Sequence, residues 1–460
     1  MSFYVRPRFF APDQFLSLPD DGSKAIEVSV IDLSGPGSFS EFNGPGRTGV
    51  LPDVTLAPWG ANPPELLWKK TLGAGWSGFV AADGLAITQE QRGENEMVTA
   101  YDVETGDIVW FYAEKGQRFE EEMGGIGPRA TPTIDGDLVF AQGATGILVC
   151  LNRGTGELVW RRNIVDDVGS DMATDGKLIL WGRSGSPLVV GDKVIVPGGG
   201  KDNNFTALIA YDRSTGDEVW RGGSEQISYS TPVLMNFFGS QQIVIVNEGS
   251  VAGYDPADGN ELWRYEREGN SSADANTSQP RQVGVDRLLV SKGYSMGAEL
   301  LQLNKDADGT IQVSSEWANP RVLRTKLTSA VVQDGYAYGL NEGILECVEL
   351  ETGKRRWKGG RYRHGQLLLV GNQLIVLSED GSLYQIEASP EKPEPTPALP
   401  AISGITWNNL CLWRDFLIVR NARQAACFRV KADWKPRPLP QDEPDSPAAE
   451  TESNATVEGA

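Results

Sequence analysis

Ala100-Tyr-Asp-Val-Glu-Thr-Gly-Asp-Ile-Val-Trp110 decides the fold of this chain, because its pattern returns four more times. The further copies run from Cys150 to Trp160, from Ala210 to Trp220, from Gly253 to Trp263 and from Cys347 to Trp357. Every copy places an Asp, Asn or Glu eight residues before the Trp and a Gly four residues before it. A template that recurs every few tens of residues indicates a repeat architecture.

The template itself predicts a tight turn between two strands. Its Asp, Asn or Glu ends the first strand, since such a side chain bonds backbone groups two residues later. The Gly supplies the positive φ that a tight hairpin needs. We expect the small residue that begins each copy to leave room for a large ring from a neighbouring repeat. One unit alone cannot bury the Trp, so the units must stack.

Eight units can be counted by their third strands. These strands are expected to end near Asp102, Asn152, Asp212, Asp255, Asn304, Glu349, Glu387 and Arg429. The eighth unit has no outer strand of its own, because the chain after Asp433 is rich in Pro and acidic residues. The strand around Trp68 precedes the first unit and can supply it. We therefore predict an all-β, eight-bladed β-propeller of four-stranded antiparallel blades, closed into a ring by this N-terminal strand.

Composition limits the partners of this fold. The 460 residues carry 42 Lys and Arg against 62 Asp and Glu, a net charge of −20, which disfavours nucleic acid as a partner. No apolar run approaches the roughly 18–20 residues of a membrane span. Met1–Phe10 lacks the apolar region of a signal peptide, so either there is no export signal or this start lies downstream of one. We expect a monomer.

The sequence divides into three parts. Residues 1–43 have weak periodicity and are predicted to form an arm lying on the domain. Residues 44–434 form the propeller. Residues 435–460 form an acidic tail with too few apolar side chains to order itself, and we expect it to be disordered.

The repeated pattern small-x-Asp-x-x-Thr-Gly-x-x-x-Trp resembles the tryptophan-docking motif of pyrroloquinoline-quinone (PQQ)-like eight-bladed propellers. That superfamily contains BamB-type lipoproteins of the outer-membrane assembly machinery and quinone-dependent dehydrogenases. The resemblance implies one of two functions: a non-catalytic, BamB-like protein-binding platform, or a PQQ-dependent alcohol or sugar dehydrogenase. It points to the periplasm or another extracytoplasmic compartment. The platform is our main hypothesis and needs no cofactor, whereas the alternative needs PQQ with calcium.

The candidate site lies where the inner strands begin, around one mouth of the central channel. Basic, aromatic and amide side chains gather there: Arg129, Trp181, Arg183, Tyr229, Gln279, Arg281, Arg324, Lys326, His364 and Trp407. Arg suits carboxylate recognition and stacking. We expect this mouth to bind an anionic peptide segment or a small polycarboxylate. The competing interpretation pairs each Arg with an acidic residue of a neighbouring blade.

Catalytic and metal-binding patterns are weak by comparison. Three of the four Cys, at positions 150, 347 and 427, occupy the small repeat position and are interpreted as buried filler. No Cys-x-x-Cys-His haem motif and no adjacent Cys pair occur, and we predict no metal site. Asp171, Asp274 and Glu342 stand near unit starts, yet none lies in a motif that assigns it a catalytic role.

Overall fold

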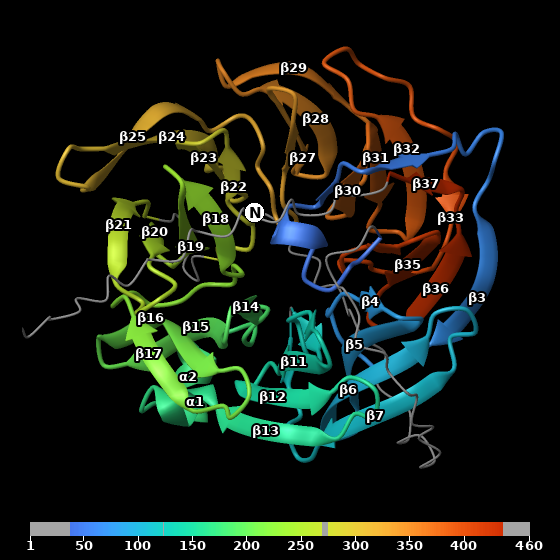
Figure 1. Cartoon of the computed structure of the whole chain (residues 1–460). Helices are drawn as coiled ribbons and strands as arrows, with labels where there is room; N and C mark the ends of the chain where they lie inside the picture. The colour runs from blue at the N-terminus through green and yellow to red at the C-terminus, as the bar shows by residue number, and fades with distance from the viewer. Residues whose placement is uncertain (1–36, 123, 269–274, 436–460) are drawn as a thin grey trace, which may run out of the picture.

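The computed structural model describes residues 37–122, 124–268 and 275–435. The predicted domain boundaries remain a prediction, because most of the arm (1–36) and almost all of the tail (436–460) lie outside the described residues. Within these limits the chain forms eight blades around a central axis, as Figure 1 shows. The predicted all-β, eight-bladed propeller is confirmed.

Each blade is an antiparallel sheet whose strands follow one another from the axis outward. Blade 1 contains β4 (Val80–Ala82), β5 (Leu85–Arg92), β6 (Asn95–Asp102) and β7 (Ile108–Glu114). Blade 2 contains β10 (Thr133–Asp135), β11 (Leu138–Gln142), β12 (Ile147–Asn152) and β13 (Leu158–Asn163). Blade 3 contains β14 (Leu188–Val190), β15 (Lys193–Lys201), β16 (Asn204–Asp212) and β17 (Glu218–Gly222). Blade 4 contains β18 (Val233–Phe237), β19 (Ser240–Val246), β20 (Ser250–Tyr254) and β21 (Glu261–Glu266).

The second half of the ring follows the same plan. Blade 5 contains β22 (Arg281–Val283), β23 (Arg287–Lys292), β24 (Gly297–Lys305) and β25 (Ile311–Asn319). Blade 6 contains β26 (Val331–Gln333), β27 (Tyr336–Asn341), β28 (Ile344–Glu349) and β29 (Lys354–Gly359). Blade 7 contains β30 (Gln366–Val370), β31 (Gln373–Leu377), β32 (Ser382–Glu387) and the short β33 (Leu399–Pro400). Blade 8 contains β34 (Cys411–Trp413), β35 (Phe416–Arg420), β36 (Gln424–Arg429) and, outermost, β3 (Glu65–Thr71).

The strand β3 closes the ring as predicted. It pairs antiparallel with β36, with Trp68 opposite Cys427, so the last blade is completed by residues that precede the first one. A second link adds β2 (Val54–Leu56) to β37 (Ala432–Trp434). Closure leaves no blade without its fourth strand, although in blade 7 that strand has only two residues.

The repeated template forms a turn and places its Trp against the next blade. In the first copy, the carboxylate of Asp102 accepts hydrogen bonds from the backbone N–H groups of Glu104 and Thr105, at 2.9 and 2.8 Å. The indole N–H of Trp110 donates to the carbonyl of Arg153 in the next blade at 2.8 Å, and its ring lies on Gly156. The template Gly therefore has two reasons to be Gly: positive φ and the ring above it.

The small residue serves a different neighbour from the one expected. Ala100 faces the Trp of its own blade across the sheet, and Cys150 does the same with Trp160. A β-bulge follows each of these pairs. Trp263 departs from the pattern, because its N–H donates to Gln242 within its own blade. The turn after β24, in the next blade, also departs from the template in length and spacing. All four Cys are buried and free.

An N-terminal segment fills the central channel, and we call Gly37–Leu51 the plug. Its short 3₁₀ turn η1 (Pro45–Arg47) lies at the centre of the ring in Figure 1. The plug pairs Phe39 with Ala81 of blade 1 and ends in β1 (Val50–Leu51), which runs parallel to β30 of blade 7. Further bonds join Ser40 to blade 2 and Gly37 to blade 8.

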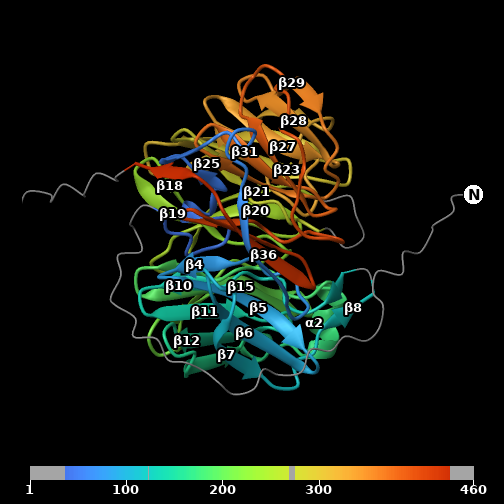
Figure 2. The same ribbon diagram turned by 90° about the vertical axis from the view of Figure 1, so that its right-hand side faces the viewer.

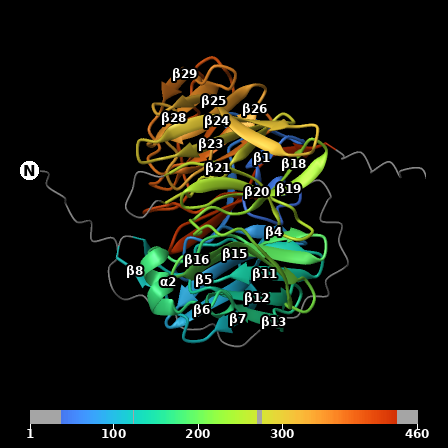
Figure 3. The same ribbon diagram turned by 90° about the vertical axis from the view of Figure 1, so that its left-hand side faces the viewer.

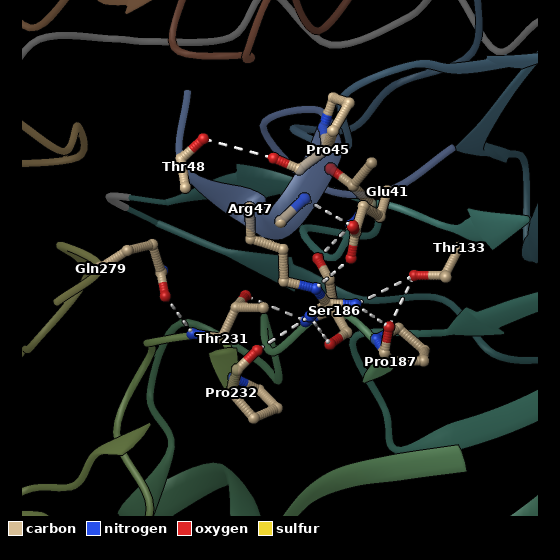
Figure 4. A network of polar contacts seen from close by, with 12 residues as sticks. Glu41, Pro45, Arg47, Thr48, Thr133, Ser186, Pro187, Thr231, Pro232 and Gln279 are labelled. Atoms are coloured by element: carbon tan, nitrogen blue, oxygen red, sulfur yellow. Dashed lines mark hydrogen bonds and ion pairs between the residues drawn. The ribbon is translucent and has the colours of Figure 1, made fainter. Parts of the chain in front are cut away.

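Arg47 at the tip of the plug is fully buried and saturated with acceptors (Figure 4). Its guanidinium forms an ion pair of 2.9 Å with Glu41 and donates to the carbonyls of Ser186, Pro187 and Pro232 and to the hydroxyl of Thr133. These partners belong to blades 2, 3 and 4. The carbonyl of Arg47 in turn accepts from Arg281 of blade 5, and Gly49 packs against Val331 of blade 6. The plug thus touches all eight blades.

Candidate functional site

The two ends of the channel differ. We call the face where the inner strands meet their second strands the lower face, and the plug reaches the axis from there, since Gly37 bonds the turn at Arg414 and Leu51 bonds Gly371. We call the opposite face, where each outer strand connects to the next inner strand, the upper face. The predicted site residues precede or begin inner strands, and they therefore belong to the upper end of the channel or to the wall below it.

Three of the predicted site residues lie in the wall and are already engaged. Arg183 is buried and forms a two-pronged ion pair with Asp175, with nitrogen–oxygen distances of 2.7 and 3.1 Å. Gln279 is buried and accepts from the backbone N–H of Thr231 at 3.0 Å. Arg281 is buried and donates to the carbonyls of Ala330 and Arg47. Burial lowers the pKa of Arg281 to about 9. These side chains hold blades and plug together.

Aromatic side chains line the mouth above them in pairs that bridge neighbouring blades. Trp407 packs on Trp76 with ring centroids 4.7 Å apart, and Trp181 packs on Tyr229 at 5.3 Å. The ammonium of Lys326 stands 4.9 Å from the centre of the Tyr294 ring. Such contacts fix the side chains at low entropic cost and leave partly exposed faces at the mouth.

Arg129 binds the same backbone carbonyl as Trp76 of the first pair. Its guanidinium donates to the carbonyls of Gly124 and Gly125, at 3.0 and 2.9 Å, and lies over the Phe119 ring at 4.5 Å. The carbonyl of Gly124 also accepts from the indole of Trp76. Burial lowers the pKa of Arg129 to about 10. Arg129 therefore supports a hairpin of the upper face, β8 (Glu120–Glu121) and β9 (Gly125–Ile126), rather than presenting a free cation to a ligand.

The remaining predicted residues lie over blades 6, 7 and 8. Arg324 is partly exposed and donates to the carbonyl of Pro320 at 2.7 Å. His364 is half-buried, and burial, with Lys326 nearby, lowers its pKa. The indole of Trp407 donates to Glu379 at 2.7 Å. The structure thus separates the predicted set into a buried wall, an aromatic mouth and a basic edge at blades 6 and 7.

The carboxylates that the sequence offered for catalysis do not converge. Asp171 caps the helix α2 (Met172–Leu178) by accepting from the backbone N–H of Thr174 at 2.9 Å. Glu342 is exposed in the turn between β27 and β28, and Asp274 lies outside the described residues. In residues 37–435, apart from the two gaps, no group of three His, Cys, Asp or Glu side chains is arranged to hold a metal ion.

The sequence reasoning missed an apolar group on the upper face. The connection from β13 to β14 contains α1 (Ile164–Asp167) and α2, and Figures 2 and 3 show α2 beside β8 on one side of the ring. Met172, Leu178 and Leu180 on and after this helix are exposed, by 46%, 37% and 43%. Three apolar residues ahead of Trp181 were a signal in the sequence, but nothing there showed that a short helix would expose them. Among the described residues, no helix has the length and apolar composition to cross a membrane.

Comparison with known proteins places this geometry in a family. A family model described as outer membrane protein assembly factor BamB matches residues 53–174 and 129–359, more than half of the chain. The chain belongs to the BamB family. BamB of Yersinia pestis is 20% identical over 325 residues, which cover 67% of this chain and 70% of that protein. BamB of Kangiella koreensis is 25% identical over 159 residues, and this match spans about a third of its length, 34%.

Solved structures agree on the fold. BamB from Moraxella catarrhalis superposes with a TM-score of 0.54 at 15% identity, covering 80% of this chain and 99% of that BamB. A europium-containing methanol dehydrogenase reaches a TM-score of 0.52 at 11% identity, covering 86% of this chain and 98% of the dehydrogenase. At these identities the likeness shows the propeller alone, which BamB shares with an enzyme.

Proposed function

We propose that this chain is a non-catalytic platform that docks a protein partner during outer membrane protein assembly, outside the cytoplasm and as a monomer. The BamB relatives carry that assembly role in their names. The observation that carries the proposal is the exposed apolar group of Met172, Leu178 and Leu180, held on the upper face of a ring whose channel is filled. A filled channel leaves the surface as the place where a partner is recognised.

The α2 connection has the rigidity that a docking surface needs. Asp171 caps its first turn, and the buried ion pair of Asp175 with Arg183 fastens the helix to the channel wall. Trp181, directly after the apolar residues, is fixed against Tyr229. Apolar side chains on a pre-organised support bind without a large ordering cost, and this favours α2 as the centre of the interface.

Site-specific photo-crosslinking tests this function. A photoreactive residue at position 180 is expected to form adducts with components of the outer membrane assembly machinery in cells. The matched control is position 285, because Val285 is an exposed aliphatic residue (69%) in the turn between β22 and β23 on the lower face. Equal adducts from both positions, or adducts from position 285 alone, would contradict docking at α2.

The quinone-dependent dehydrogenase has no observation in the described residues that favours it over the platform. Reconstitution of the purified protein with PQQ and calcium tests it through the quinone absorbance and dye-linked alcohol oxidation. Bound quinone together with turnover would overturn the platform function. A protein that stays colourless and inactive while crosslinking at position 180 would support it.

A further inference from the structure

The charge of the molecule reverses sign in one stretch. Residues 321–364 carry nine Lys and Arg against five Asp and Glu, in a chain whose net charge is −20. Two connections of the upper face hold five of these nine cations. The first leads from β25 to β26 and contains Arg321, Arg324 and Lys326, and the second leads from β29 to β30 and contains Arg361 and Arg363. These five cations, with Lys358, form what we call the basic rim.

Backbone contacts hold the two connections against one turn. The N–H of Glu342 donates to the carbonyl of Arg324 at 3.1 Å, and the N–H of Arg363 donates to the carbonyl of Gly343 at 3.0 Å. Residues 342 and 343 form the turn between β27 and β28. A Cβ atom on Gly343 would collide with the backbone of Arg363, so the packing is close. The basic rim is therefore one surface over blades 6 and 7, not two loops that happen to carry charge.

The cations of this rim are weakly neutralised. Within the described residues, Arg324 donates to a carbonyl, Lys326 lies over an aromatic ring, and Lys358, Arg361 and Arg363 form no ion pair. The carboxylates that face them are Glu342, Glu346, Glu379 and Asp380. Glu346 forms an ion pair with Arg355, and Glu379 and Asp380 accept from Trp407 and Ser378. Burial lowers the pKa of Lys358, and Arg355 and Arg324 lower it further, whereas Glu346 and Glu342 act in the opposite direction. Positive charge is thus crowded here.

A pocket with one apolar wall opens beside the same connection. It has a volume of about 240 Å³ and lies between blades 6 and 7, where the Pro-rich segment 389–398 takes the place of a long outer strand. Leu345, Trp357, Tyr362 and Ile386 supply its apolar wall, and the segment from Lys392 to Pro395, which includes Glu394, completes the lining. Tyr362 is flanked in the chain by the exposed Arg361 and Arg363, so the pocket lies next to the stretch that carries these two cations.

We propose that the basic rim and this pocket bind an acidic peptide segment of a partner protein, with a large apolar side chain of that peptide in the pocket. Charge complementarity favours an acidic ligand, and a pocket of this size and lining takes one aromatic or branched side chain. The chain's own acidic tail fits less well. Residues 436–460 contain six Asp and Glu but no aromatic residue, and the chain reaches Lys435 beside Asp53 on the lower face. This proposal does not rest on docking at α2.

Fluorescence anisotropy on the full chain tests the proposal. The probe is a labelled peptide of ten Asp and Glu residues with one central Phe. Arg361→Glu with Arg363→Glu is expected to weaken its binding by about tenfold or more, because two attractive charges become repulsive. Lys69→Glu with Arg423→Glu makes the same change of charge at exposed positions of blade 8 and is expected to alter affinity by less than about twofold.

A second comparison leaves the protein unchanged. Replacing the central Phe of the probe by Ser is expected to weaken binding to the wild-type chain by about 10- to 150-fold, the range for losing one buried apolar side chain. Equal affinity of the two peptides, or equal effects of the two charge variants, would overturn the proposal. Sedimentation of the chain with phosphatidylglycerol vesicles without peptide binding would overturn it in favour of a lipid surface. Residues 436–460 can also be deleted with no other change to the chain. If this deletion alone tightens binding of the Ser peptide, the basic rim would be assigned to the chain's own tail instead of a partner.

Discussion

Arginines stand in two contrasting regions of this propeller. In the plugged channel, Arg47 is fully buried, and its guanidinium donates hydrogen bonds to a carboxylate, a hydroxyl and three carbonyls. On the basic rim, Arg361 and Arg363 are exposed, and the described residues supply them with no ion pair. The same residue type therefore fastens blades in one region and offers unused charge in the other. Saturation of the donors, not the presence of Arg, distinguishes a structural site from a binding site.

Removing Arg47 is the strongest test of this contrast. Arg47→Ala is expected to lower the free energy of unfolding by about 4–5 kcal/mol, the upper end for breaking a buried pair, because five acceptors in three blades and the plug lose their donor. Urea titration followed by tryptophan fluorescence measures it. Arg361→Ala is the control and should change stability by less than about 0.5 kcal/mol. Similar losses of stability in Arg47→Ala and Arg361→Ala would contradict the distinction between the structural arginine of the channel and the exposed arginine of the rim.

The docking tryptophans extend the contrast to the outer edge of the ring. Trp160→Ala is expected to cost about 3 kcal/mol or more, because the buried indole lies on Gly216 and donates to Arg213 of the next blade. Trp181→Ala at the mouth removes a ring of the same size that is only partly buried, and a smaller loss of stability is expected. The same urea titration compares them, and a larger loss for Trp181→Ala would contradict the placement of Trp181 at the partly exposed mouth.

A buried carboxyl group sharpens the comparison through pH. Glu96 is 4% exposed, accepts from the N–H of Ala144 at 3.0 Å, and has its pKa raised to about 7 by burial. Because the folded state binds this proton more tightly than the unfolded state, Glu96 costs stability as the pH rises from about 4.5 to 7. Over this pH range, the free energy of unfolding of Glu96→Gln should therefore rise relative to that of the wild type by about 1.4 kcal/mol for each unit by which the pKa of Glu96 is raised. A constant difference between pH 5 and 8 would contradict it.

The smallest effect on stability is expected at α2. Leu180→Asp places a charge at an exposed position, so the free energy of unfolding should stay within about 0.5 kcal/mol of the wild type. If this surface docks a partner, recovery of the assembly machinery with the chain should nevertheless fall strongly. Quantitative pull-down measures that recovery, and unchanged recovery would show that α2 is ordinary surface.

The sequence predicted the regular parts of this molecule well. Third strands end at Asp102, Asn152, Asp212, Glu349, Glu387 and Arg429, as the repeated template indicated. The ring closure by β3 was also foreseen, because Trp68 lacked a unit of its own. A Trp at fixed spacing from a turn has one structural role, so its pattern is readable without coordinates.

The irregular parts were not predictable in the same way. No plug was predicted around Arg47, because its partners are carbonyls of Ser186 and Pro232, 139 and 185 residues away. Every residue has a carbonyl, so such partners leave no mark in the sequence. Likewise Arg183, Arg281 and Arg324 looked equivalent by position, and only their neighbours separate wall from rim.

The plug and the closing strand are synthesised long before the residues that they contact. The N–H of Trp59, which lies between them in the chain, donates to Gln385, 326 residues later, and β3 cannot pair until β36 has been made. At a ribosomal rate of roughly 5–20 residues per second, these early residues spend on the order of 20 to 70 seconds without their partners. During that interval the new chain is an open arc with an exposed sheet edge at each end. A factor that shields this arc until Arg429 emerges is therefore expected to raise the yield of closed rings.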